Sequence, residues 1–130
     1  MSLLAALLIS VAACTETTMM PMSQDTFKVS SNTECGRTEA QDAAFKRAAI
    51  EVINMGGDRF IIMNTASDSE TSLYYDSFMG LTTYTTDQHD LIVKKLERGN
   101  PQYSNGLSAR EVLGADWQAL VAEGLPNTCV

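Results

Sequence analysis

The stretch that decides the fold joins an amphipathic helix to an apolar strand. Residues 38–63 read TEAQDAAFKRAAIEVINMGGDRFIIM. Thr38 and Gln41 match a capping box, which predicts that a helix begins at Thr38. Met55-Gly56-Gly57 predicts its end, because glycine accepts the left-handed backbone of a helix stop. Small and apolar side chains recur at i, i+4 and i+5 spacing and predict the buried face of this helix: Ala40, Ala44, Phe45, Ala48, Ala49, Val52 and Ile53.

Three short apolar runs predict the strands of a sheet. Thr26–Ser30 alternates polar and apolar residues, with Phe27 and Val29 on one face. Phe60–Met63 is continuously apolar, which predicts a central strand covered on both faces. If these two strands are neighbours, they should run parallel with a right-handed crossover. Asp90–Glu97 predicts a third strand, antiparallel to the second, whose paired lysines are typical of a sheet edge.

The C-terminal part predicts a second helical segment. Ser108 and Glu111 match another capping box, and an apolar stripe continues to Glu123. Gly114 can divide the segment into two short helices, and Trp117 is expected in the core. The order strand, helix, strand, strand, helix predicts an α+β fold, a small sandwich of a three- or four-stranded sheet with helices on one side.

Composition limits the classes of protein that fit. The chain has 130 residues, of which 45% are hydrophobic and 19% charged, and its formal net charge is −7. These proportions are those of one ordinary globular domain and exclude a disordered or fibrous chain. Nine scattered Lys and Arg residues provide no basic patch for a phosphate backbone, so nucleic acid is not an expected partner.

An apolar run near the N-terminus ends at a cysteine. Residues 3–13 read LLAALLISVAA, which is too short to span a bilayer but fits the core of a signal peptide. Val11-Ala12-Ala13-Cys14 resembles the lipobox of bacterial lipoproteins. That resemblance implies export, attachment of diacylglycerol to the Cys14 sulfur, cleavage before Cys14 and acylation of the freed amine. The alternative is a buried N-terminal helix of a cytosolic protein with an incidental cysteine.

The resemblance also implies an address and a domain organisation. Thr15, where an inner-membrane lipoprotein would carry aspartate, implies an outer-membrane anchor with the domain facing the periplasm. We expect a signal peptide at 1–13, a lipidated cysteine and flexible tether at 14–25, and a single α+β domain at 26–130. At this level the chain is similar to the small disulfide-containing domain of the Rcs envelope-stress sensor lipoprotein and to small lipoproteins of Gram-negative bacteria. This likeness implies address and architecture and assigns no functional residue.

The remaining cysteines form an even pair. With Cys14 used by lipid, Cys35 and Cys129 are left in a compartment that oxidises thiols, which predicts a disulfide between them. The alternative is a reactive thiol at Cys35, because a helix N-terminus lowers the pKa of a thiol.

Residues 64–90 carry no clear element. Their aromatic residues are expected either on extended strand ends or a flap, or in a patch that binds a partner. The candidate patch consists of Tyr74, Tyr75, Phe78 and Tyr84.

No catalytic motif or metal-binding spacing is present. His89 lies near Asp87 and Asp90, but a nucleophile would have to come from elsewhere in the fold. One histidine and two oxidised cysteines cannot form a zinc site, so neither a metal nor a cofactor is expected. We read the acidic residues of this region as a solvated loop rather than a calcium site: Asp68, Glu70 and Asp76.

The sequence therefore predicts a non-enzymatic envelope protein, held to the membrane through Cys14, that binds another envelope protein. The rival reading is a small periplasmic hydrolase or thiol-redox protein that uses His89 or Cys35.

Overall fold

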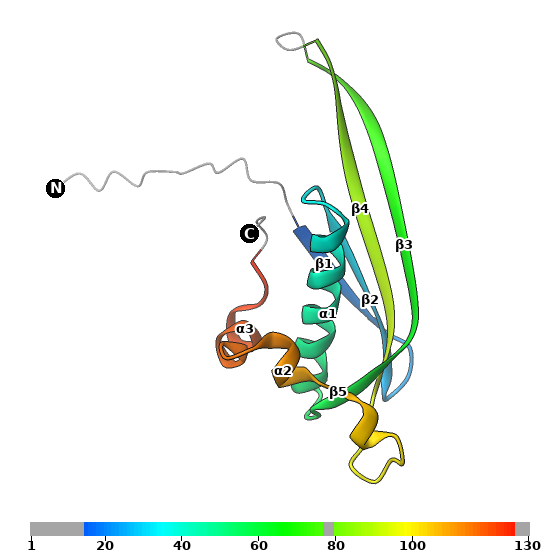
Figure 1. Cartoon of the computed structure of the whole chain (residues 1–130), viewed down its shortest axis with the longest axis vertical. Helices are drawn as coiled ribbons and strands as arrows, with labels where there is room; N and C mark the ends of the chain where they lie inside the picture. The colour runs from blue at the N-terminus through cyan, green and yellow to red at the C-terminus, as the bar shows by residue number, and fades with distance from the viewer. Residues whose placement is uncertain (1–14, 77–79, 127–130) are drawn as a thin grey trace, which may run out of the picture.

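The protein combines a five-stranded antiparallel sheet with three helices, in a computed structural model that describes residues 15–76 and 80–126 (Figure 1). The predicted α+β class is confirmed. A short 3-10 turn, Tyr103–Asn105, precedes the fifth strand. The elements are β1 Thr15–Pro21, β2 Thr26–Thr33, α1 Arg37–Asn54, β3 Arg59–Asp76, β4 Gly80–Lys95, β5 Leu107–Ser108, α2 Ala109–Leu113 and α3 Trp117–Glu123.

The strands lie in the order β1-β2-β4-β3-β5, and every neighbouring pair is antiparallel. The expected count of three or four strands is therefore wrong. β4 lies between β2 and β3, so these two strands run in the same direction without pairing. The expected edge position of residues 90–97 is also wrong, because they end the central strand. Lys95, the last residue of β4, contacts the end of α1. Its ammonium donates a hydrogen bond to the Met55 carbonyl oxygen at 3.3 Å and forms an ion pair with Glu97 Oε1 at 2.9 Å.

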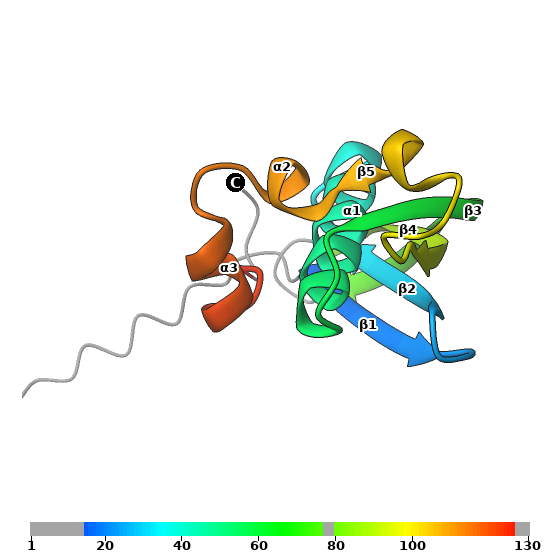
Figure 2. The same ribbon diagram turned by 90° about the horizontal axis from the view of Figure 1, so that it is seen from below.

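The core lies between one face of the sheet and α1. Figure 2 shows α1 on this face, with α2 and α3 on the same side of the sheet. The predicted inward positions Phe27 and Val29 are buried, as is the alanine-rich face of α1. Alanine side chains let the helix approach the strands closely, and this packing is the main source of stability for a helix of 18 residues. The central cluster consists of Phe27, Val29, Ala44, Ala48, Ala49, Ile50, Val52, Phe60, Leu91, Val93, Ala109 and Leu113.

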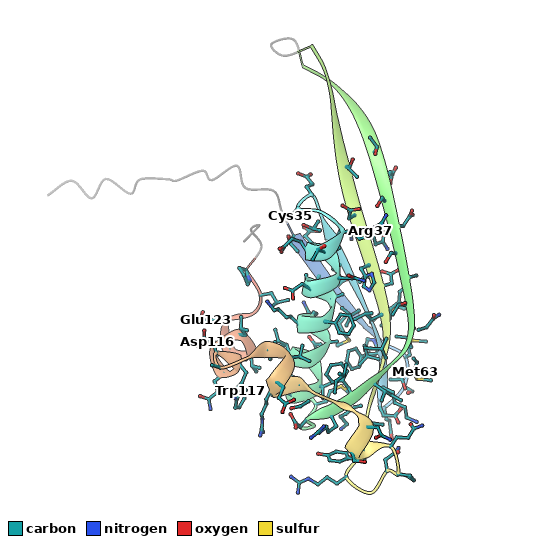
Figure 3. The ribbon with its side chains drawn as sticks, in the orientation of Figure 1. Cys35, Arg37, Met63, Asp116, Trp117 and Glu123 are labelled. Atoms are coloured by element: carbon teal, nitrogen blue, oxygen red, sulfur yellow. The ribbon has the colours of Figure 1, made fainter. Side chains whose placement is uncertain are left out.

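The second apolar run is covered on one face rather than two. Phe60 is fully buried, but Met63 is 58% exposed and lies on the side of the sheet away from the helices (Figure 3). A register shift between Ile62 and Asn64 interrupts the pairing of β3 with β4 at this point. Among the described residues no helix covers the outer face of the sheet. The prediction that residues 60–63 are covered on both faces is therefore wrong, although all four are apolar.

The start of α1 differs from the prediction, whereas its end agrees. The helix begins at Arg37 after Gly36, whose φ is 108°, and no side chain caps it, so the expected capping box at Thr38 is wrong. The helix ends at Asn54, and Gly56 follows with a φ of 81°. That positive φ is the left-handed backbone expected of a helix stop.

The C-terminal helical segment agrees with the sequence reading. The Ser108 hydroxyl accepts a hydrogen bond from the Glu111 backbone N–H at 3.4 Å, which confirms the N-cap of α2. Gly114, with a φ of 86°, separates α2 from α3 as expected. Trp117 is half-buried and packs against the core, and the Arg110 guanidinium lies 4.9 Å from the centre of its ring.

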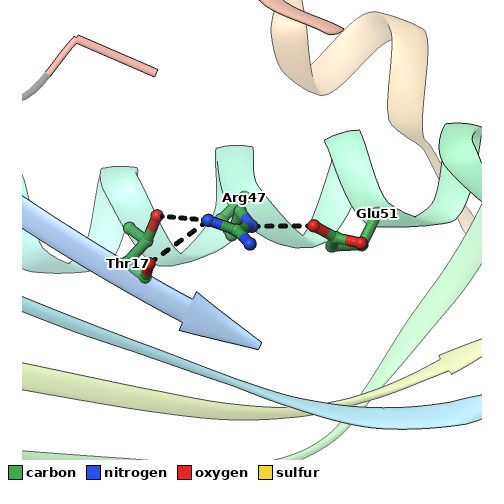
Figure 4. A network of polar contacts seen from close by, with 3 residues as sticks. All are labelled: Thr17, Arg47 and Glu51. Carbon is green, nitrogen blue, oxygen red and sulfur yellow. Dashed lines mark hydrogen bonds and ion pairs between the residues drawn. The ribbon is translucent and has the colours of Figure 1, made fainter. Parts of the chain in front are cut away.

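The sheet begins earlier than expected, because Thr15–Pro21 forms β1 rather than a flexible tether. This strand pairs with β2 from Thr15 opposite Thr33 to Pro21 opposite Phe27. The Arg47 guanidinium of α1 donates hydrogen bonds to Thr17 and pairs with Glu51 (Figure 4). The tether prediction failed because this polar strand is held by backbone pairing with β2 and by a contact from α1, and neither leaves an apolar period in the sequence.

Candidate functional site

The β3–β4 hairpin extends well beyond the rest of the sheet. β4 pairs with β2 only from Lys94 to Asp87, whereas its pairing with β3 continues to Asp76 opposite Gly80. Seven residue pairs of β3 and β4 lie beyond the last row shared with β2, and at about 3.3 Å per residue they reach about 23 Å further. Figure 1 shows this two-stranded arm rising past the helix layer. The expectation of extended strand ends in residues 64–90 is therefore confirmed.

The outer edge of β3 is open along most of its length. β5 pairs with β3 only at Arg59 and Phe60. In the described part of the chain, no strand pairs with this edge between residues 61 and 76. Residues 63–71 are all exposed, so unpaired backbone groups face solvent along a continuous strand.

This edge lacks the lysine and proline residues that often protect a sheet edge, and the charges on it are all acidic. Residues 61–76 contain no lysine, arginine or proline, and the irregularity at residues 62–64 lies at the base of the arm rather than along it. The opposite edge of the sheet, β1, is seven residues long and ends at Pro21. The longer edge, and the one without proline, is thus that of β3.

The exposed part of β3 carries negative charge. Asp68 and Glu70 lie two positions apart and so share one face of the strand. Together with Asn32, Thr86 and Gln88 they line a shallow hollow of about 60 Å³ on the outer face of the sheet. No lysine or arginine forms an ion pair with either carboxylate within residues 15–76 and 80–126.

The predicted aromatic patch belongs to this arm. The backbone of Tyr74 pairs with Thr82, and that of Tyr75 with Leu81, near the end of the hairpin. Tyr84, on β4, is opposite Ser72. Phe78 and the side chains of these tyrosines lie outside what the structure describes, so the patch stays a prediction.

A second candidate is a polar cluster beneath the N-terminal half of α1, where the core stops being apolar. Strand register aligns Ser31, His89 and Ser67 in one row. The next row aligns Thr33, Asp87 and Ser69. The β2 and β4 members of both rows are buried, whereas Ser67 and Ser69 are exposed on β3. Sequence reasoning identified His89 but missed both serines, although the alternation of hydroxyl residues at 65, 67, 69 and 71 was a signal for them.

His89 is held through one of its two ring nitrogens. Its Nδ1 lies 2.6 Å from the Ser67 hydroxyl. Its Nε2 is buried and has no hydrogen-bond partner among the described residues. Burial lowers the pKa of His89 below its ordinary value, and the charge of Asp90 opposes that shift. The ring is therefore favoured in its neutral form at neutral pH.

The cluster contains two of the groups that a serine hydrolase uses, a serine and a histidine. Activation of a serine requires a histidine whose second nitrogen is oriented by another group, usually a carboxylate. Asp87 instead accepts a hydrogen bond from Ser69, and the Nε2 of His89 is the nitrogen that lacks a partner. The shallow hollow nearest these strands opens on the opposite face of the sheet. The structure thus brings a serine to His89 without assembling a triad in the described residues.

The predicted lipid and disulfide sites are described in part. Cys35 lies in the turn between β2 and α1, half-buried, with its Sγ 3.6 Å from the Thr15 hydroxyl. Cys14 and Cys129 lie outside the described residues. Lipidation of Cys14 and the Cys35–Cys129 disulfide therefore stay predictions.

Three further properties bear on the type of site. Among residues 15–76 and 80–126, no group of three or more His, Cys, Asp or Glu side chains is arranged to hold a metal ion, and this includes Asp68 and Glu70. No helix in the same residues is both long enough and apolar enough to cross a membrane. A hollow of about 460 Å³ beyond the end of α1 is lined by both charges, with Asp58 and Glu97 beside Arg98 and Arg110.

No known family, curated protein or solved structure matches the chain.

Proposed function

We propose that the protein is a non-enzymatic, lipid-anchored module of the bacterial cell envelope that binds another envelope protein through the β3–β4 arm. The observation that supports this proposal is the length of the arm beyond the core, combined with the open outer edge of β3. Among the residues whose side chains the structure describes, Phe60 is the one member of the central apolar cluster from β3, and it lies at the opposite end of the strand from the arm. A surface of this kind is typical of a binding site displayed on a small scaffold.

The anchor in this proposal is the lipid on Cys14, and the address is the outer membrane with the domain facing the periplasm. The lipobox-like sequence Val11-Ala12-Ala13-Cys14 supports it. Replacing Cys14 with Ser should leave the signal peptide uncleaved and move the protein out of the lipid-modified membrane fraction, as measured by mass spectrometry and detergent partitioning. An unchanged mass and unchanged partitioning would contradict the anchor.

The binding role is tested by photo-crosslinking in living cells. A photoreactive residue at Glu70 should give one discrete adduct with another envelope protein, because this position lies on the arm. The matched control is the same residue at Gln118, which is exposed on α3. Equal adducts at both positions, or none at Glu70, would exclude the arm as the binding surface.

The Ser67–His89 contact favours a second function, that of a small periplasmic hydrolase. In it, His89 accepts the Ser67 proton as the Ser67 oxygen bonds to the carbonyl carbon of an ester. The ester C–O bond then breaks, the alcohol leaves with the proton that His89 returns, and water hydrolyses the acyl-serine. Hydrolysis of p-nitrophenyl acetate by the wild type should then be lost in Ser67→Ala and kept in Ser69→Ala. Equal rates in all three proteins would exclude this function.

A further inference from the structure

We propose that the outer edge of β3 accepts an extended, cationic segment of the partner protein as an added strand of the sheet. This inference rests on the proposed binding role of the arm and specifies how the partner is recognised. Its two grounds are that, among residues 15–76 and 80–126, no strand pairs with the outer edge of residues 61–76 and no cation neutralises Asp68 or Glu70.

The backbone provides the affinity in this mode of binding. An extended peptide beside an open edge forms main-chain hydrogen bonds whatever its side chains are. β3 offers such an edge over its exposed stretch, where its other side is already satisfied by pairing with β4. The strand is therefore ordered before the partner arrives, which lowers the entropy cost of binding.

The charges determine which strand fits. Side chains two positions apart share a face, so Asp68 and Glu70 call for two cations two positions apart on the incoming strand. The neighbours of these acids on β4 are the uncharged Gln88 and Thr86. Lys28 lies on the same outer face of the sheet, but its ammonium forms an ion pair with Asp90 at 3.8 Å. A segment with Lys or Arg at alternate positions supplies the missing charge.

A second copy of this chain fits the edge poorly. In an antiparallel pairing of two β3 strands with full overlap of residues 64–76, Glu70 lies opposite Glu70. A shift of two residues toward the base of the arm places Asp68 opposite Glu70. Like charges directly opposite one another destabilise a strand pair. The chemistry of the edge thus favours a basic partner strand over self-association.

The test uses the purified full-length protein and synthetic peptides. An eight-residue peptide of alternating threonine and lysine should bind and slow amide hydrogen exchange within residues 64–71 at least tenfold. A second peptide has the same sequence, but the backbone nitrogens that would donate hydrogen bonds to β3, every second one, are methylated. It should not bind, because it keeps the charge but cannot form main-chain hydrogen bonds with β3. Equal binding of the methylated peptides, or protection of β1 instead, would overturn strand addition.

Matched variants distinguish attraction by the charges on β3 from attraction by the net charge of the protein. Asp68→Asn with Glu70→Gln should weaken binding of the lysine peptide about fourfold at low salt, since each of the two exposed ion pairs contributes a factor of about two. Asp116→Asn with Glu123→Gln removes the same charge on the far side of the molecule (Figure 3) and should leave binding unchanged. Equal loss in both pairs would mean that net charge, not the edge, attracts the peptide, and would overturn the proposal.

A charge swap completes the test. Asp68→Lys with Glu70→Lys should reject the lysine peptide and bind a peptide of alternating threonine and glutamate. Failure of every peptide, with the Glu70 crosslink to an envelope protein intact, would overturn strand addition while leaving the proposed function in place. Peptide binding without any crosslink in cells would instead contradict the proposed function.

Discussion

Arg47 of α1 joins the first strand of the sheet to the helix layer through Thr17. One guanidinium nitrogen lies 3.2 Å from the Thr17 carbonyl oxygen and 3.1 Å from its hydroxyl, across 30 positions of sequence. The Nε atom donates to Glu51 at 2.9 Å, which orients the side chain. Because β1 is polar and lies at an edge of the sheet, this contact adds to its pairing with β2 in holding the strand.

Replacing Arg47 with Ala should therefore release β1. We expect the free energy of unfolding to fall by about 1 to 2 kcal/mol, the usual loss for hydrogen bonds to a charged group. Amide hydrogen exchange of residues 15–21 should accelerate, while that of β4 stays nearly unchanged. Arg37→Ala, at the exposed start of α1, is the control and should have no effect on β1. Unchanged exchange of β1 in the Arg47 variant would show that strand pairing alone suffices.

The stability of the protein should depend on pH through His89. Its imidazole is 3% exposed, and burial lowers its pKa below the value of 6.5 that it has when unfolded. Its contribution to stability is therefore complete above about pH 6.5 and lost as the pH falls through the lowered pKa of the folded state. Urea unfolding at pH 7.5 and pH 5 should show a larger loss in the wild type than in His89→Gln. The same loss in both would refute this assignment.

The close approach of α1 to the sheet should make its alanines intolerant of larger side chains. Ala48 is fully buried against the strands. Ala48→Leu should lower the free energy of unfolding by about 1 to 3 kcal/mol, because three added carbon atoms have no space. Ala43→Leu, at a half-buried position of the same helix, should cost less. Chemical denaturation of the two variants measures both losses. A greater loss of unfolding free energy at position 43 than at position 48 would contradict the prediction.

The break between α2 and α3 should depend on glycine. Gly114 has a φ of 86° and a ψ of −164°, a backbone conformation that is nearly restricted to glycine and costs an ordinary residue about 1 to 3 kcal/mol. A Cβ at this position would meet no neighbouring atom within 4 Å, so the loss in Gly114→Ala isolates the backbone term. Gly99→Ala is the matched control, since Gly99 is equally open but not at positive φ. Equal melting temperatures for the two variants would contradict the prediction.

The mature protein should contain a disulfide between Cys35 and Cys129. A crosslink across 94 positions of sequence restricts the unfolded chain and contributes up to about 4 to 5 kcal/mol in the chain-entropy description. Reduction should therefore lower the melting temperature, and denatured, unreduced protein should show neither thiol by alkylation and mass spectrometry. Cys35→Ser with Cys129→Ser should melt at the temperature of the reduced protein. Alkylation of both cysteines in oxidised envelope material would favour the reactive-thiol alternative.

Sequence patterns identified the parts of the fold that bury apolar side chains. The alternation of Phe27 and Val29 and the alanine stripe of α1 predicted their elements because burial imposes a period on the sequence. The base of the arm has no such period, since residues 67–71 are polar on both faces and pair with residues 85–89 of β4, which are also polar. The length of the arm became visible only in the register of β3 with β4.

The candidate sites depended even more on three-dimensional pairing. Ser67 and His89 are 22 positions apart, and only the register of two strands brings them together. The openness of the β3 edge is likewise a property of topology, because it depends on where β5 stops. Asp68 and Glu70 were noticed as acids, but their role follows from the strand on which they lie.

The immediate start of β1 at Thr15 has a mechanical consequence if Cys14 carries lipid. Many lipid-anchored domains are joined to the anchor by a flexible linker, which lets the domain rotate freely relative to the bilayer. Here the rotatable bonds between the acyl chains and the first paired residue are few, so the domain would be held close to the lipid with restricted tilt. Its search for a partner becomes two-dimensional and oriented, which raises the effective concentration toward proteins embedded in or bound to the same leaflet.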